Sequence, residues 1–136
     1  MDVPANNHAE LVRMAYGRLF AGDLDGFLDC LGEDCVVHEA QSLPYGGTHK
    51  GREGIRHLVT RIMDTWQVFR FDIEEVLSGP DTAIAYGRMT VAGKNTGASA
   101  SFPLAEHWRI RDNKVIEITA IYGDTHRARQ AAGDDK

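Results

Sequence analysis

One acidic residue, Glu106, lies in the middle of a stretch whose alternate residues are otherwise apolar. Side chains alternate between the two faces of a β-strand, so every second residue shares a face. The set that shares a face with the acid runs from residue 98 to residue 110: Ala98, Ala100, Phe102, Leu104, Glu106, Trp108 and Ile110. This pattern predicts a strand with one buried face and with Glu106 pointing inward. A carboxyl group placed there must find a partner or stay protonated, because burying a bare charge is strongly unfavourable.

Helical spacing marks three segments in the first half of the chain. Apolar residues recur three and four positions apart over 7–21, 24–31 and 52–65, which predicts three helices. A short strand, Cys35–Glu39, and a turn-rich loop at 44–51 separate the last two of them. The helices therefore gather before most of the strands.

Strand alternation replaces helical spacing in the second half. Residues 69–77, 82–92, 98–111 and 114–124 alternate between two faces, and glycine, proline, aspartate or asparagine occupies the turns between them. Helices that precede a run of antiparallel strands indicate an α+β fold. We expect a cone-shaped α+β barrel, in which a curved, mostly antiparallel sheet and three N-terminal helices enclose a pocket.

Length and composition indicate a single domain over residues 1–136. The chain is 43% hydrophobic and 26% charged, which is typical of a globular protein with a core. Its net charge of -5 and its dispersed basic residues argue against nucleic acid or an anionic membrane as partner. The N-terminal residues lack a basic segment followed by an apolar one, so we expect no signal peptide and a cytoplasmic location. We expect Cys30 and Cys35 to be buried thiols rather than a disulfide.

Three acids fall on predicted inward faces. Glu39 alternates with Val37 on the first strand, Glu106 lies on the long strand, and Asp124 alternates with Tyr122 at the end of the last strand. Two carboxyl groups in one apolar cavity have pKa values that are pushed apart, which provides one base and one acid. The alternative for Asp124 is that it caps the segment that follows it. We expect the tail from residue 130 to be frayed.

Other large side chains are candidates for the wall of the pocket. The candidate set, apart from the acids, is Tyr16, Tyr45, Trp66, Tyr86, Met89, Trp108 and Tyr122. Tyr16 lies at the edge of the first helix's apolar stripe, from where its hydroxyl can reach a pocket. The alternative for the aromatic residues is an ordinary place in the core.

Metal and phosphate chemistry have little support in the sequence. His38, Glu39 and His49 do not have the spacing of a zinc site, and neighbouring strand residues point in opposite directions. The glycine-rich loop at 46–51 lacks the Gly-Lys-Ser/Thr of a phosphate-binding loop, and no serine lies in a nucleophile elbow. We therefore expect neither a metal nor a cofactor.

Three segments carry a resemblance to a known superfamily. They are AGDLDGF at 21–27, EDCVVHE at 33–39 and GTHKGREGI at 47–55. With them the chain resembles the nuclear transport factor 2-like superfamily over nearly its whole length, and within it the ketosteroid isomerases and SnoaL-like polyketide cyclases. The resemblance implies the same cone-shaped fold and a small apolar substrate or ligand.

The resemblance also implies roles for two acids. The isomerases carry a catalytic aspartate at the end of the first strand, where Glu39 stands, and a protonated aspartic acid in a segment that matches Glu106–Arg109. Glu39 is then the general base, and Glu106 is a neutral donor to the developing enolate. The isomerases' oxyanion-hole tyrosine matches Ala15, and Tyr16 is the next residue, about 100° further around the helix.

These features predict an enzyme that removes a proton next to a carbonyl in a small apolar substrate without a cofactor. The overall reaction would be an isomerisation or a cyclisation. The alternatives are a non-catalytic module that binds a hydrophobic ligand, and a hydratase or epoxide hydrolase on the same fold. We also expect a homodimer that forms through the outer face of the sheet. The apolar residues predicted on that face are Val36, Val76, Ile84, Val115 and Ile121.

Overall fold

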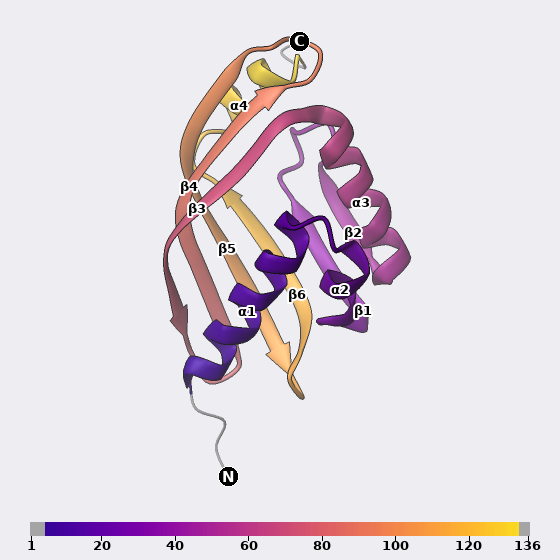
Figure 1. The fold of residues 1–136 in the computed structure, drawn as a ribbon, viewed down its shortest axis with the longest axis vertical. Helices are drawn as coiled ribbons and strands as arrows, with labels where there is room; N and C mark the ends of the chain where they lie inside the picture. The colour runs from indigo at the N-terminus through magenta and orange to yellow at the C-terminus, as the bar shows by residue number, and fades with distance from the viewer. Residues whose placement is uncertain (1–4, 134–136) are drawn as a thin grey trace.

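A six-stranded sheet curves around one side of the molecule in the order β2–β1–β6–β5–β4–β3 (Figure 1). The computed structural model describes residues 5–133, and their side chains from residue 8 onward. Neighbouring strands pair antiparallel except for β1 and β6, which run parallel. The strands are β1 (Leu31–Glu39), β2 (Gly47–Lys50), β3 (Trp66–Ser78), β4 (Thr82–Gly93), β5 (Ser99–Arg111) and β6 (Lys114–Tyr122). The predicted α+β class and the curved, mostly antiparallel sheet are confirmed.

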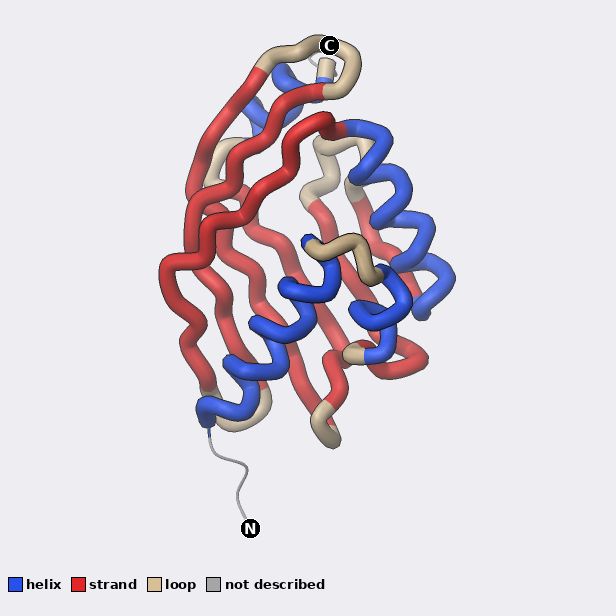
Figure 2. The backbone as a smooth tube through the Cα atoms, in the orientation of Figure 1, coloured by secondary structure: helices blue, strands red, loops and turns tan. Residues whose placement is uncertain are grey.

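Three helices cover the concave face of this sheet, and a fourth lies at its far end (Figure 2). They are α1 (Ala5–Phe20), α2 (Leu24–Asp29), α3 (Gly51–Thr65) and α4 (Thr125–Ala132). Asp23 caps α2 by accepting a hydrogen bond from the Gly26 amide at 2.9 Å. The second helix is shorter than the predicted 24–31, because Leu31 is already the first residue of β1 and pairs with Val115. No helix within the described residues is long and apolar enough to cross a membrane.

Helix α4 corrects the expectation of a frayed tail from residue 130. The helix continues to Ala132, and Ala128 and Ala131 are buried against the end of the sheet. The Thr96 hydroxyl, in the β4–β5 turn, donates a hydrogen bond of 2.6 Å to the Ala131 carbonyl. A Cβ at Gly93 would overlap that same carbonyl, so the close approach of α4 depends on glycine there. Residues 134–136 lie outside the described part of the chain.

A β-bulge in β3 reverses the predicted alternation. Ile73 pairs with Gly87 but Glu75 pairs with Tyr86, so one extra residue stands in β3. Beyond the bulge Val76 packs against the core, and its neighbour Leu77 is 56% exposed on the outer face. The prediction that Val76 lies on the outer face is therefore wrong.

A second irregularity, between β5 and β6, has the same effect. Arg109 pairs with Glu117 but Ile110 pairs with Val115, which leaves Ile116 as the extra residue. Val115 is fully buried as a result. The prediction that it lies on the outer face is also wrong.

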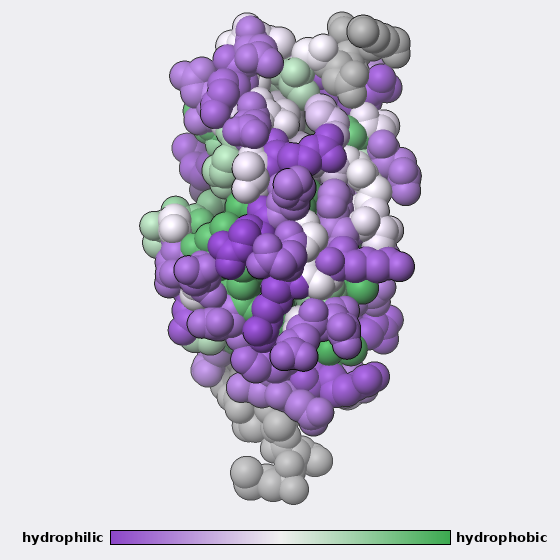
Figure 3. All heavy atoms as spheres, turned by 90° about the vertical axis from the view of Figure 1, so that its right-hand side faces the viewer, coloured by the Kyte–Doolittle hydropathy of each residue, from purple (hydrophilic) through white to green (hydrophobic). Residues whose placement is uncertain are grey.

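The surface on the side of α3 is mainly hydrophilic, and its larger hydrophobic patch lies along one edge at mid-height (Figure 3).

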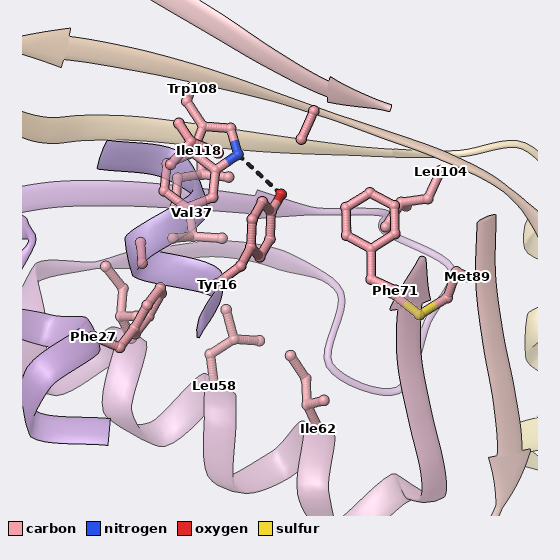
Figure 4. Close-up of a cluster of buried hydrophobic side chains, with 14 of the residues drawn as sticks. Tyr16, Phe27, Val37, Leu58, Ile62, Phe71, Met89, Leu104, Trp108 and Ile118 are labelled. Carbon is pink, nitrogen blue, oxygen red and sulfur yellow. Dashed lines mark hydrogen bonds between the residues drawn. The ribbon is translucent and has the colours of Figure 1, made fainter. Parts of the chain in front are cut away.

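The core lies between the concave face of the sheet and α1, α2 and α3 (Figure 4). On β5 the alternate residues Phe102, Leu104, Trp108 and Ile110 are all buried, as their spacing predicts. This alternation also turns Glu106 toward the core.

Candidate active site

An internal cavity of about 60 Å³ lies between the concave face of the sheet and helices α1 and α3. Among the described residues that line it, only Glu39, Glu106 and Tyr16 bring side-chain oxygens, and the rest of the wall is aliphatic, aromatic or thioether. Glu39 ends β1, Glu106 is in the middle of β5, and Tyr16 is on α1. The fold thus brings the two predicted catalytic acids into one cavity.

Glu106 is the end of a hydrogen-bond chain. The Tyr16 hydroxyl donates to Oε1 of Glu106. The indole Nε1–H of Trp108 donates to the Tyr16 hydroxyl oxygen at 3.1 Å (Figure 4). An indole N–H can only donate, so the direction of this second bond is fixed. Two donors in sequence therefore point at a buried carboxyl group.

Helix α1 fixes the position of Tyr16. Tyr16 follows Val12 by four residues, and both lie on the buried stripe of the helix. The ring of Tyr16 packs edge-on against Trp108 and Phe71, with ring centroids 5.0 Å and 5.4 Å away. Ala15, the position that the isomerases' tyrosine matches, is fully buried. It is the next residue, Tyr16, that brings its hydroxyl to the acid.

Glu39 lies in a different hydrogen-bonding environment. Its Oε1 is buried and has no hydrogen-bond partner among the described residues. Tyr122 interacts with the carboxyl group and lowers its pKa, and the Tyr122 and Tyr45 hydroxyls are 2.8 Å apart in a hydrogen bond. The indole Nε1–H of Trp66 donates to the Tyr45 hydroxyl at 2.9 Å. Glu39 thus ends a second chain of polar groups but keeps one oxygen unpaired.

Two further candidate wall residues, Tyr45 and Tyr86, do not line the cavity. Tyr86 is 40% exposed on the outer face of the sheet, whereas Tyr45 belongs to the polar network behind Glu39. Its side chain is fully buried, although it belongs to the loop between β1 and β2. The His49 ring and the Tyr45 carbonyl share a hydrogen bond of 2.9 Å, which holds this loop in place. A large aromatic residue in a turn-rich segment was the available signal, because such loops are otherwise exposed and polar.

Burial raises the pKa values of both acids, and the charge of Glu106 adds to the shift at Glu39. Burial raises the pKa of Glu106, and the hydrogen bond from Tyr16 lowers it part of the way back. Burial raises the pKa of Glu39 well above its usual range, the negative charge of Glu106 raises it further, and Tyr122 lowers it. Burial and the charge of Glu106 also raise the pKa of Tyr16. The tyrosine therefore stays protonated as a donor.

The described residues that line the cavity provide no cation to balance two negative charges. No lysine, arginine or histidine is among the described residues that line it. Two ionised carboxylates in one apolar cavity repel each other and both lose their hydration. One negative charge shared by Glu39 and Glu106 is therefore favoured over two, and the pair titrates as a unit.

The remaining predicted pocket residues divide into two groups. Met89 and Trp108 line the cavity. Trp66 and Tyr122 do not line it but lie behind it, in the chain that ends on Glu39. Asp124 is a correction to the predicted set, because its carboxylate caps α4 by accepting a hydrogen bond of 3.0 Å from the Arg127 amide. It takes no part in lining the cavity.

His38 points away from Glu39 to the outer face of the sheet. Its Nε2 lies 2.7 Å from Oε2 of Glu117, and its Nδ1 lies 3.1 Å from the Thr48 hydroxyl. Arg109 binds the other oxygen of Glu117 at 3.2 Å. Within residues 5–133 no group of three histidine, cysteine or acidic side chains is placed to hold a metal ion.

Comparison with known proteins identifies the family. The family model described as the SnoaL-like domain matches residues 12–118. The chain belongs to the SnoaL-like domain family. The matched range contains the whole cavity, including both acids and Tyr16. No curated protein matches the sequence.

Solved structures show the same fold for this SnoaL-like domain. A nuclear transport factor 2-like protein of unknown function from Burkholderia pseudomallei has 22% identity and a TM-score of 0.86, over 93% of this chain and 97% of that one. TerC, crystallised with polyporic acid, has 20% identity and a TM-score of 0.84, over 93% and 98%. A candidate polyketide cyclase from Xanthomonas campestris has 18% identity and a TM-score of 0.77, over 94% and 98%. At these identities the likeness establishes the cone-shaped fold alone.

Proposed function

We propose that this SnoaL-like domain is a cofactor-independent enzyme that removes a proton from the carbon next to a carbonyl group. One observation carries the proposal. Two buried carboxyl groups, Glu39 and Glu106, line one apolar cavity that has no balancing cation among its described residues. A pair of this kind holds one charged and one protonated acid side by side. These are the two groups that enolisation requires.

Each acid has its own role in the proposed reaction. The ionised carboxylate takes the proton from the carbon, and the C–H electron pair moves into the enolate. The protonated acid donates a hydrogen bond to the enolate oxygen, where negative charge develops. In isomerisation the base, now protonated, returns its proton to another carbon. In cyclisation the enolate carbon attacks a second carbonyl carbon in the same molecule, the π electrons of that carbonyl move to its oxygen, and this alkoxide takes the proton back from the acid. A carboxylate buried in an apolar wall is also a stronger base than one in water.

The size of the cavity limits which part of a substrate it holds. About 60 Å³ accommodates only a few non-hydrogen atoms, such as a carbonyl group and its neighbours. A larger open depression, which we call the vestibule, has a volume of about 480 Å³ and lies between α1, α3 and the start of β3. The cavity and the vestibule share Leu19, Phe20, Val59 and Phe69 as wall residues. We therefore infer an apolar substrate whose carbonyl end enters the cavity and whose body fills the vestibule.

The comparisons support a small hydrophobic ligand but do not select a reaction. SnoaL-like domains bind small hydrophobic molecules, one structural relative is a candidate polyketide cyclase and another was crystallised with polyporic acid. The rival proposal is a module that binds such a molecule without changing it. The largely apolar wall of the cavity suits a hydrophobic molecule in either case.

Exchange of carbon-bound hydrogen with solvent tests the proposed function most directly. A panel of apolar ketones, including a Δ5-3-ketosteroid, is incubated with the protein in heavy water and followed by mass spectrometry. We expect deuterium to enter next to the carbonyl, and conversion of the steroid to a conjugated enone to be detected by its absorbance.

The matched variants are Glu39→Gln, Glu106→Gln and, as a control on the outer face, Glu117→Gln. We expect loss of either acid to slow exchange, by about 10²- to 10⁴-fold for the acid that acts as the base, and the control to change nothing. Equal exchange in the wild type and in both cavity variants would refute the proposal. A retained ligand that stays unlabelled would favour the binding module.

We also propose a homodimer through the outer face of the sheet, in a cytoplasmic protein. Leu77 and Ile84 face each other across β3 and β4, and Tyr86 and Ile121 flank Ala105 on the next row. Leu77 and Ile121 are each 56% exposed, so the chain alone leaves an apolar patch in solvent. Light scattering should give the mass of two chains for the wild type and of one chain for Ile121→Glu. A monomeric wild type would remove this proposal.

A further inference from the structure

The two acids in the cavity differ in what surrounds each carboxyl oxygen, and the difference points to the opposite division of roles from the one that the family resemblance implies. We propose that Glu106 is the ionised member of the pair and acts as the base, while Glu39 holds the proton and donates to the substrate's carbonyl oxygen. The location of the proton stands on the geometry alone, whereas the catalytic roles rest on the proposed function.

The hydrogen bond that Glu106 accepts from Tyr16 favours a negative charge on this acid. The Trp108 indole donates into the Tyr16 oxygen, so the hydroxyl proton of Tyr16 is free to point at Oε1 of Glu106. Hydrogen bonds to a charged acceptor are roughly twice as strong as neutral ones, and donors in sequence polarise one another. The chain therefore stabilises the anion on Glu106. The packing of Tyr16 between Trp108 and Phe71 keeps this donor in place.

The surroundings of Glu39 favour the neutral acid. Its Oε1 is buried and unpaired among the described residues, and an unpaired buried carboxylate oxygen carries a full desolvation cost. A proton on Glu39 removes the charge and reduces that cost. Tyr122 does contact the carboxyl group, but its hydroxyl is also bonded to Tyr45, and either of those two hydroxyls can be the donor.

Electrostatics agree with this geometry. The charge of Glu106 raises the pKa of Glu39, whereas burial and the Tyr16 bond govern the pKa of Glu106. The titratable groups that interact with the pair are Tyr16, Tyr45 and Tyr122, and burial raises the pKa of each of them as well. The phenols thus stay neutral while the pair loses its first proton. With no cation on the cavity wall, the second proton remains on Glu39.

The proposed step is balanced within the pair. The carboxylate of Glu106 takes a proton from the carbon next to the carbonyl, and the electron pair of the broken C–H bond forms the enolate. Glu39 keeps its proton throughout and shares it with the enolate oxygen in a hydrogen bond. Glu106 then returns its proton to carbon, so neither acid changes its state over a turnover.

Isotope-edited infrared spectroscopy locates the proton without any substrate. Wild-type protein and the variants Glu39→Gln, Glu106→Gln and Glu117→Gln are labelled with carbon-13 at the glutamate carboxyl carbon. We expect the wild type to show the C=O band of one protonated glutamic acid at pH 7. The band should vanish in Glu39→Gln and persist in Glu106→Gln and in the exposed control Glu117→Gln. A band that persists in Glu39→Gln, or one that is absent from the wild type, would overturn the assignment.

Kinetics test the catalytic roles separately. A glutamine at 39 still has an N–H that can bond the enolate oxygen, whereas a glutamine at 106 cannot take a proton. We expect Glu106→Gln to lower turnover by about 10²- to 10⁴-fold and Glu39→Gln to lower it less. A larger loss in Glu39→Gln would restore the roles that the family resemblance implies. If the wild type turns over no ketone, the proposed function fails while the infrared result still decides where the proton lies.

Discussion

The buried acid pair predicts that the folded protein becomes less stable as the pH rises above about 4.3, the usual pKa of an unfolded glutamate. Glu39 and Glu106 both have raised pKa values in the folded state, mainly because of burial. Above pH 4.3 the unfolded chain releases their protons while the folded chain keeps them. The stability that these two acids provide is thus complete below pH 4.3 and is lost as the pH rises toward each folded pKa.

The size of the effect follows from the number of protons retained. Each acid that is protonated in the folded state and ionised in the unfolded state lowers the free energy of unfolding by about 1.4 kcal/mol per pH unit. Both acids contribute just above pH 4.3, for a slope of about 2.7 kcal/mol per pH unit. Once Glu106 ionises, Glu39 alone gives about 1.4 kcal/mol per pH unit until its own folded pKa is reached. The curve should therefore show a steep arm followed by a shallower one.

Urea unfolding followed by circular dichroism at closely spaced pH values from 5 to 8 measures this curve. Glu39→Gln should remove the shallow arm at higher pH, and Glu106→Gln should remove part of the steep arm. The control is Glu117→Gln. Ion pairs with His38 and Arg109 lower the pKa of Glu117, so its contribution is complete above pH 4.3 and is lost only at lower pH. A wild-type slope between pH 6 and 8 that is unchanged in Glu39→Gln would refute the reasoning.

Three further predictions concern the surroundings of the pair. Tyr16→Phe keeps the ring but leaves the Trp108 indole and the acid without their partner, so chemical denaturation should show a loss of about 2 to 4 kcal/mol. Gly93→Ala should displace α4, because the added Cβ overlaps the Ala131 carbonyl, and should lower stability by about 1 to 3 kcal/mol. Phe20 is 41% exposed between the cavity and the vestibule, so Phe20→Ala should speed the uptake of a fluorescent apolar probe in stopped-flow experiments, with little loss of stability. Unchanged stability in either of the first two variants would contradict the role given to that residue. An unchanged uptake rate in the third would contradict the role of Phe20 between the cavity and the vestibule.

Alternation and helical spacing predicted most of the fold because they reflect local burial. The inward face of β5 follows directly from a period of two, and Glu106 is turned toward the core as predicted. The same rule failed for Val76 and Val115, since a single extra residue in a strand reverses every side chain beyond it. A bulge depends on pairing between strands, which the pattern within one strand does not contain.

Helix α4 escaped prediction for a different reason. Its buried side chains are those of alanine, which give a weak hydrophobic pattern in a segment rich in charge. The close approach of this helix to the sheet depends on the absence of a side chain at Gly93, and a hydrogen bond from Thr96 joins the two. Asp124 has the alternation of an inward acid, so the sequence leaves a place in the pocket and a helix cap as alternatives, and the structure shows the cap. An aspartate that caps a helix and an aspartate that lines a pocket can have the same sequence pattern. Only the hydrogen-bond partner of the carboxylate in the folded chain distinguishes the two roles.

The sequence identified both acids but not the difference between them. Glu39 and Glu106 each stand on an apolar strand face, so alternation gives them the same description. What distinguishes them is contributed by distant parts of the chain, because Tyr16 is 90 residues away from Glu106 and Tyr45 is 77 residues away from Tyr122. A glutamate with a donor and a glutamate with an unpaired oxygen cannot have the same proton affinity in one small cavity. The fold alone therefore does not set the roles of the two acids; those roles depend on which of them the tyrosine on α1 reaches.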